Sequence, residues 1–270
     1  MVDAMQENER RMEADAALCT RLDAIVRRMR LALAAAGRAA DDARLVAVSK
    51  WHGADKVAAL AAHWRSAGQA TFGESYVQEA LAKLPAVEAL LRQAGGAEQG
   101  APDWHFIGHV QSRKAKEIVG RFSLIHSVDS VKLAQNLHKE WTAQVAGRPR
   151  ALAEAAPAPQ AVLLQVNIGE EPQKSGVMPG KVHELCAAVQ ELPGLSLQGL
   201  MCLPPDLEDA EAVRPYFAAL RGLRDEARLR SGLALPHLSM GMSHDFEVAL
   251  AEGATLIRVG TDIFGPRQQG

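Results

Sequence analysis

Short apolar or β-branched runs alternate with longer amphipathic runs along nearly the whole chain of 270 residues. Strands that alternate with helices in this way pair in parallel through right-handed crossovers. Eight such units at this length predict an α/β fold, a (β/α)8 TIM-type barrel, with an open doubly wound sheet as the alternative. The eight predicted strands are Leu45–Ser49, Ala70–Gly73, Trp104–Gly108, Ser123–Ser127, Val162–Ile168, Leu197–Met201, His237–Met240 and Thr255–Gly260.

Helical spacing of apolar residues predicts the elements between these strands. It also predicts a helix before the first strand, from Leu18 to a stop at Gly37. The polar residues 1–16 ahead of it predict a disordered tail, and residues 17–270 a single domain. Two segments rich in Gly, Ala or Pro, Gln93–Asp103 and Gly147–Gln160, predict loops. The remaining predicted helices are Ala54–Ser66, Tyr76–Leu91, Val131–Val145, Met178–Leu192, Ala210–Leu229 and Phe246–Ala251.

Composition excludes several classes of partner. The formal net charge is -2 and the pI about 6.5, so no general field attracts nucleic acid or an anionic membrane. The three cysteines lie far apart and form neither a disulfide framework nor a zinc pattern, as expected in a reducing cytoplasm. No apolar run is long enough to span a bilayer, and the N-terminus lacks the core of a signal peptide. We therefore expect a cytoplasmic protein that binds neither nucleic acid nor membrane.

Lys50 follows the first predicted strand directly. In a (β/α)8 barrel the C-terminal strand ends converge on one mouth, where the reactive groups lie. A lysine at such a mouth loses solvation, which favours the neutral amine that attacks an aldehyde as a Schiff base. Taken alone, a solvated lysine at a strand end is the simpler interpretation.

Small residues follow the seventh and eighth predicted strands, in Ser239–Ser243 and Gly260–Thr261. Barrels of this type commonly bind phosphate there through backbone N–H groups and hydroxyls. We expect the loop amides to contact the phosphate and the carboxylates of Asp245 and Glu247 to face outward. A phosphate site combined with a strand-one lysine is more informative than either feature alone.

Arg258 lies within the last predicted strand, where an unpaired guanidinium is costly to bury. Its partner is either a structural carboxylate or a heterocyclic nitrogen of a cofactor. Because arginine donates and does not accept, it keeps a pyridine nitrogen unprotonated and weakens the ring as an electron sink. Several histidines lie near predicted strand ends, but none forms a metal pair, so we predict no metal site.

Seven stretches of the chain resemble the pyridoxal phosphate homeostasis protein family, which is alanine-racemase-like. They run in order over most of the chain, and the last is the most specific. The stretches are Leu45–Lys50, Phe72–Ala80, Trp104–Lys114, Ile125–Asp129, Leu163–Gly176, Gly199–Pro205 and Leu238–Gly265.

The resemblance implies that the cofactor is pyridoxal 5′-phosphate (PLP). It implies a fold-type III PLP-binding barrel without the β-domain of alanine racemases. It implies Lys50 as the cofactor lysine, Arg258 near the pyridine nitrogen, and phosphate contacts at the last two strand ends. Position 75 departs from the family, which usually has Asn where this chain has Ser75. The residues assigned to cofactor binding are Lys50, Ser75, His109, Ser239, Met240, Gly241, Arg258, Gly260 and Thr261.

Three functions compete for such a site. The first is binding and delivery of PLP in its homeostasis, without catalysis, with PLP-dependent apo-enzymes as partners. The second is a PLP-dependent racemase or decarboxylase, which lacks an obvious second base here because the only tyrosines are Tyr76 and Tyr216. The third is a phosphate-binding barrel enzyme without a cofactor. We favour the first.

Lys174 follows the fifth predicted strand and places a second amine on the face of the barrel that carries Lys50. A solvated loop lysine is the simpler interpretation. The functional hypothesis is that Lys174 takes the aldehyde transiently, or holds a second cofactor molecule, during transfer to an acceptor.

Overall fold

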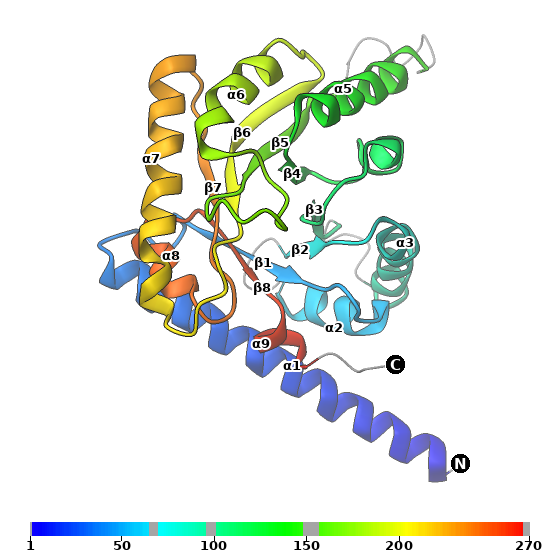
Figure 1. Cartoon of the computed structure of the whole chain (residues 1–270). Coiled ribbons are helices and arrows are strands. Elements are labelled where there is room, and N and C mark those ends of the chain that lie inside the picture. Colours follow the sequence, from blue (N-terminus) through cyan, green and yellow to red (C-terminus); the bar gives the residue numbers. More distant parts are fainter. Residues whose placement is uncertain (1, 65–69, 96–100, 148–156, 267–270) are drawn as a thin grey trace.

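The computed structural model describes residues 2–64, 70–95, 101–147 and 157–266. Eight parallel strands, β1 to β8, pair in chain order, and β8 pairs with β1 to close a barrel (Figure 1). The barrel and all eight predicted strands are confirmed, with strand ends shifted by no more than two residues. The strands are β1 Arg44–Val48, β2 Thr71–Glu74, β3 Asp103–Phe106, β4 Leu124–Val128, β5 Gln160–Val166, β6 Leu195–Cys202, β7 His237–Ser239 and β8 Leu256–Val259.

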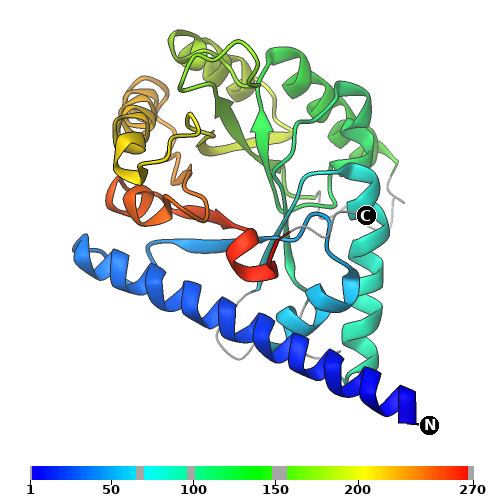
Figure 2. The same ribbon diagram turned by 60° about the horizontal axis from the view of Figure 1, so that its bottom comes forward.

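Helices surround the barrel and cover the outer faces of the strands (Figures 1 and 2). All of the predicted helices are found, although Ser66 lies outside the described residues. The four-residue helices α4 and α9 were not predicted as separate elements, because one turn is too short to show a period. The helices are α1 Val2–Ala35, α2 Ala54–Trp64, α3 Val77–Gln93, α4 Ala115–Ile118, α5 Val131–Ala146, α6 Val182–Gln190, α7 Arg214–Ser231, α8 Phe246–Ala251 and α9 Thr261–Phe264.

Helix α1 crosses one side of the barrel and packs on α2, α8 and α9 (Figure 2). Its apolar residues from Leu18 to Leu33 recur every three or four positions and are buried. The helix begins at Val2, so it includes residues for which the sequence predicted a disordered tail. Its described side chains ahead of Leu18 lie mostly exposed, and its buried residues begin at Leu18. Residues 96–100 and 148–156 of the two predicted loops lie outside the described residues.

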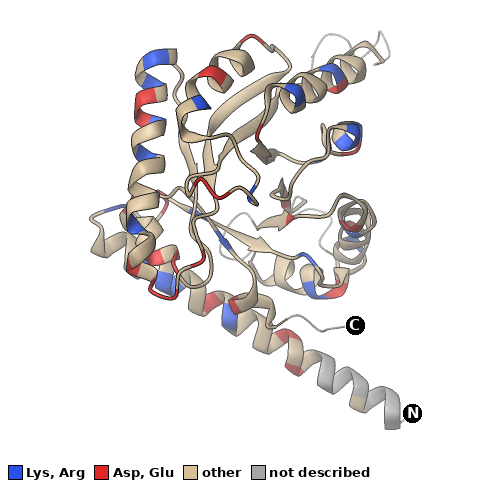
Figure 3. Cartoon of the chain, viewed as in Figure 1, with Lys and Arg blue, Asp and Glu red and all other residues tan. Residues whose placement is uncertain are grey.

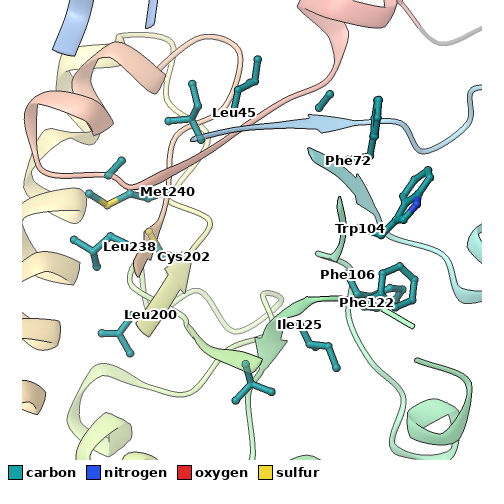
Figure 4. Packing of buried hydrophobic residues seen from close by; sticks show 14 of the residues in the cluster. Leu45, Phe72, Trp104, Phe106, Phe122, Ile125, Leu200, Cys202, Leu238 and Met240 are labelled. Carbon is teal, nitrogen blue, oxygen red and sulfur yellow. The ribbon is translucent and has the colours of Figure 1, made fainter. Parts of the chain in front are cut away.

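The core has two layers. The larger lies between strands and helices, and Figure 4 shows part of it, including Phe72, Trp104, Ile125 and Met240. The smaller lies inside the barrel, where alternate strand residues point inward, and consists of Val46, Leu124, Leu163, Met201 and Leu256. Charged residues lie mainly on helices and loops (Figure 3), so a charge on a strand needs its own explanation.

Two searches of the described residues gave negative results. None of their helices is both long and apolar enough to cross a membrane. No group of three or more His, Cys, Asp or Glu among them is placed to hold a metal ion.

Candidate functional site

A cavity of about 320 Å³ opens at the C-terminal ends of the strands. This volume is at the lower end of the range of roughly 300–1,000 Å³ typical of small-molecule sites. Five residues assigned to cofactor binding line it together: Lys50, Ser75, Arg258, Gly260 and Thr261. The remaining lining residues are Val48, Ile107, Leu203, Met242, Ser243 and His244.

Lys50 is half-buried in a tight turn directly after β1. The turn is closed by a hydrogen bond from His52 N to Ser49 O of 3.1 Å. Trp51 takes a left-handed conformation with φ of 69°, which is uncommon for a residue with a side chain and costs free energy. Surrounding contacts must therefore hold this turn in place.

A buried cluster of charges provides these contacts. Lys83 Nζ donates to Ser49 O, Glu74 Oε1 and Glu79 Oε1, each at 2.7 Å. Glu79 Oε1 in turn accepts from Trp51 N at 2.6 Å. The backbone on both sides of Lys50 is thus bound through one ammonium group.

Glu74 completes the cluster from the end of β2, where it is fully buried. Its Oε1 also accepts from Ser49 Oγ at 2.6 Å, while its Oε2 is buried without a hydrogen-bond partner. Burial raises the pKa of the Glu74 carboxyl, and the nearby Lys83 and Ser49 offset part of that shift. A buried carboxylate is tolerated here because an ammonium group lies beside it.

Arg258 lines the cavity from β8, the strand that pairs with β1, and is 4% exposed. Its NH1 donates to Ser239 Oγ at 2.5 Å and its NH2 to Cys202 O at 2.9 Å. No carboxylate of the described residues lies within ion-pairing distance of it. Burial lowers the pKa of the Arg258 guanidinium, which reflects the cost of holding this charge inside the barrel.

The loop after β7 enters the cavity through Met242, Ser243 and His244. The first half of this loop, Ser239 to Gly241, is assigned to cofactor binding from the sequence. There Ser239 lies behind Arg258, and Gly241 has a φ of 91° and no room for a side chain, since a Cβ would lie 2.6 Å from the Cβ of Ala249.

The expectation that both carboxylates after this loop face outward is correct for Glu247 and wrong for Asp245. Glu247 is half-exposed and pairs with Arg28. Asp245 is 1% exposed, and its Oδ1 accepts from Met242 N at 2.6 Å. Asp245 turns inward because it terminates the loop. Its carboxylate accepts from the amide of Met242, which is one of the amides expected to contact a phosphate.

The start of α9 offers unoccupied donors instead. The first hydrogen bonds of α9 run from Ile263 N and Phe264 N to Gly260 O, so the preceding amides have no partner within the helix. The hydroxyls of Thr261 and Ser243 line the same cavity. A Cβ on Gly260 would come within 3.3 Å of Val48, so glycine is favoured at this wall.

The other predicted residues lie outside the lining. His109 is on the rim, where its Nδ1 lies 3.4 Å from Asp129 Oδ2 and its side chain is 55% exposed. The Met240 side chain is buried in the layer between strands and helices (Figure 4). Lys174 Nζ lies 2.6 Å from Glu171 Oε1 and donates to Pro204 O at 2.9 Å.

Sequence reasoning missed the buried cluster behind Lys50. Glu79 and Lys83 are four residues apart on α3 and look like an ordinary solvated pair. A signal was nonetheless present, because Lys83 falls on the buried stripe of this helix between Ala80 and Val87. A lysine on the buried stripe of an amphipathic helix indicates a hidden ion pair.

Residues 20–268 match the protein family described as "Alanine racemase, N-terminal domain". A protein of Aquifex aeolicus (strain VF5) called "Pyridoxal phosphate homeostasis protein" is 41% identical over 250 residues, which cover 93% of this chain and 98% of that protein. PipY of Synechococcus elongatus PCC7942, solved with PLP bound, has a TM-score of 0.71 and 32% identity, over 92% of this chain and 100% of that chain.

The likeness to true racemases is more distant. Alanine racemase from Corynebacterium glutamicum is 19% identical with a TM-score of 0.59, over 90% of this chain and 60% of that chain. At this identity the likeness shows the barrel fold alone.

Proposed function

The chain belongs to the alanine racemase N-terminal domain family and, within it, to the pyridoxal phosphate homeostasis proteins, and on this premise we propose that it binds PLP at the barrel mouth and serves PLP homeostasis. The observation that carries the proposal is the convergence of Lys50, Arg258 and the start of α9 on one cavity. An amine, a donor for a ring nitrogen and a set of amides and hydroxyls are the groups that an aldehyde-bearing, phosphorylated pyridine needs.

The lining residues fit such a ligand part by part. Lys50 bonds the aldehyde carbon, and Gly260, Thr261 and Ser243 hold the phosphate. Arg258 donates to the ring nitrogen, while Val48, Ile107 and Leu203 form apolar walls. Ser75 lies on the same wall as Lys50 and replaces the amide usual in the family with a hydroxyl.

PLP supplies an aldehyde for covalent capture and a ring that can withdraw electrons. Arg258 can donate a hydrogen bond but has no acceptor atom, so its hydrogen bond would leave the ring nitrogen unprotonated and limit that withdrawal. The site therefore favours holding the cofactor over stabilising a carbanion.

A non-catalytic role agrees with the positions of the two tyrosines. Tyr76 is 45% exposed on the rim, with its ring centroid 4.7 Å from that of Trp51. Tyr216 lies in the first turn of α7 and packs against the core. Neither lines the cavity, so neither is placed as the second base that racemisation requires.

Delivery to PLP-dependent apo-enzymes extends the proposal. Lys174 is an amine held in a fixed position beyond β5 by Glu171 and Pro204. We infer that it takes the aldehyde transiently or holds a second cofactor molecule when the cofactor leaves. Passing an aldehyde between amines avoids releasing it into solution.

Two assays on one purified sample test the function. The PLP-loaded protein is incubated with L- and D-amino acids to measure racemisation, and with an apo-aminotransferase to measure the return of its activity. We expect no racemisation above the rate with free PLP, and reactivation of the apo-enzyme. Stereospecific turnover by the loaded protein would support the racemase alternative, and failure to bind PLP would contradict both functions.

A further inference from the structure

A line of hydrogen bonds starts at Arg258 and runs into the barrel interior. Arg258 NH1 donates to Ser239 Oγ on β7, which lies 2.8 Å from His126 Nδ1 on β4. Ser239 and His126 have no exposed surface. The contact therefore crosses the inside of the barrel, from one wall to the other, without water.

The same line continues toward the N-terminal end of the barrel. His126 Nε2 lies 3.0 Å from His105 Nδ1, and His105 Nε2 lies 3.3 Å from Asp103 Oδ2. His105 and Asp103 are two residues apart on β3, and Asp103 is its first residue. A guanidinium at the mouth is thus connected to a carboxylate at the opposite end through Ser239, His126 and His105.

The chemistry of the ends fixes the direction of every bond. Arginine only donates, so Ser239 Oγ accepts from it, and a carboxylate only accepts, so His105 Nε2 donates to Asp103. Between these ends, with one proton on each ring, Ser239 gives its own proton to His126 Nδ1. His126 must then carry its proton on Nε2 and donate to His105 Nδ1. His105 in turn carries its proton on Nε2 and donates to the carboxylate of Asp103.

The surroundings favour this arrangement. Burial lowers the pKa of His126 well below 6.5, and the nearby Arg258 guanidinium lowers it further, so the ring is neutral. Burial acts to raise the pKa of Asp103, but its hydrogen bond to His105, together with Ser123 and Arg44, lowers it overall. The carboxyl group is therefore ionised at neutral pH.

We propose that Asp103 acts as a counter-ion of Arg258 across the barrel, through His105, His126 and Ser239, and that these four are positioning residues for the Arg258 guanidinium. Every dipole in this hydrogen-bonded line points the same way, with its negative end toward Arg258. The line therefore adds to the effect of the buried Asp245 carboxylate, which acts on Arg258 from beyond ion-pairing distance, in stabilising a positive charge at the mouth.

This placement has a consequence for the ligand, which rests on the proposed function. A carboxylate beside a pyridine nitrogen favours its protonation, whereas an arginine alone keeps it unprotonated. Because part of the compensating charge lies at the far end of the barrel, Arg258 remains charged and is the only one of the five hydrogen-bonded residues that lines the cavity.

The tautomers of the His126 and His105 rings test the direction of these hydrogen bonds without any cofactor. In protein labelled with 15N-histidine, long-range 1H–15N NMR at neutral pH assigns the protonated nitrogen, and His126→Gln and His105→Gln variants identify the signals. We expect both rings to be neutral with the proton on Nε2. A proton on Nδ1 of His126, or a doubly protonated His126 ring, would overturn the proposal, while leaving PLP binding itself untouched.

Urea unfolding of four cofactor-free proteins tests the coupling. Asp103→Asn is compared in the wild-type background and in the Arg258→Met background. We expect it to lower the urea midpoint in the first and to lower it roughly half as much or less in the second, because coupled sites are not additive. Equal shifts in the two backgrounds would refute Asp103 as the counter-ion.

Asp42→Asn is the matched control, since Asp42 is an exposed residue just before β1 and takes no part in the hydrogen-bonded line from Arg258 to Asp103. It should shift the midpoint equally in both backgrounds. Unequal shifts for Asp42 would mean that Arg258→Met changes the whole fold, and the coupling claimed for Asp103 would then be withdrawn.

Discussion

The two walls of the cavity hold their functional residues by different means. On the β1 wall, the cluster of Lys83, Glu74 and Glu79 binds the backbone on either side of Lys50. On the β8 wall, hydrogen bonds bind the guanidinium of Arg258 itself. The difference follows from the chemistry. On the proposed function, Lys50 forms and releases a covalent bond and needs a fixed backbone, whereas Arg258 only donates a hydrogen bond and needs a fixed guanidinium.

The largest effect is expected from removing the cation of the β1 wall. Lys83→Met leaves Glu74 and Glu79 without their ammonium partner and should lower the free energy of unfolding by about 3 kcal/mol. It should also reduce the fraction of protein that captures PLP covalently, because the turn carrying Lys50 is released. Urea unfolding and the yield of borohydride-fixed adduct measure the two effects.

Lys139→Met is the control for this prediction, since Lys139 is exposed on α5. A Lys83→Met protein as stable and as reactive as this control would show that the buried cluster does not support Lys50.

Arg258→Ala tests the β8 wall. It leaves a void and an unpaired carbonyl at Cys202, and should cost about 2–4 kcal/mol of stability. PLP affinity should fall as well, while Lys50 still captures the aldehyde at high PLP concentration. Thermal unfolding and fluorescence titration measure these changes. Unaltered PLP affinity would mean that Arg258 is structural only, and the comparison of the two walls would fail.

A smaller effect concerns pH. Because the pKa of folded His126 lies below its unfolded value near 6.5, the unfolded state binds a proton first as pH falls. Its contribution to stability is therefore complete above pH 6.5 and is lost below it, at up to about 1.4 kcal/mol per pH unit.

His126→Asn should flatten this dependence between pH 6.5 and 5.5, and His109→Asn, at an exposed histidine, should not. Glu74, whose raised pKa acts in the opposite direction, is present in all three proteins. Identical slopes for wild type and His126→Asn would show that His126 is protonated in the folded state.

The smallest structural effect is expected at Lys174. Its replacement by alanine removes one partly exposed ion pair and should change stability by less than about 1 kcal/mol. Covalent capture at Lys50 should be unchanged, while transfer of PLP to an added apo-enzyme slows. Lys181→Ala, which removes a similar pair with Glu184 on an exposed surface, is the control. Equal transfer rates in both variants would make Lys174 an ordinary surface lysine.

The fold was predictable because strand and helix periods are local properties. The eight strands and the position of Lys50 after β1 follow from runs such as Leu45–Ser49. Residues assigned to the site from their type and their place near a strand end, such as Arg258 and Thr261, line the cavity. Their contact with a cofactor stays a prediction. In the loop after β7 the sequence identified the segment but not its inward half, because the inward turn of Asp245 depends on a local hydrogen bond to Met242.

The supporting groups were not predictable from single elements. Asp103, His105 and His126 are unremarkable polar residues on separate strands, and only the closed barrel brings them into one line. Lys83 likewise meets Ser49 only after β1 and α3 have packed. The polar interior of a barrel is a property of its tertiary structure.

The central claim is that Lys50 carries PLP. The most direct measurement is borohydride reduction of the PLP-loaded protein, followed by proteolysis and mass spectrometry of the modified peptide. We predict one reduced pyridoxyl group per chain at low PLP excess, located on Lys50, and none in a Lys50→Ala variant that retains the wild-type fold. Full occupancy in Lys50→Ala, or a wild-type adduct located mainly on another lysine, would contradict the account.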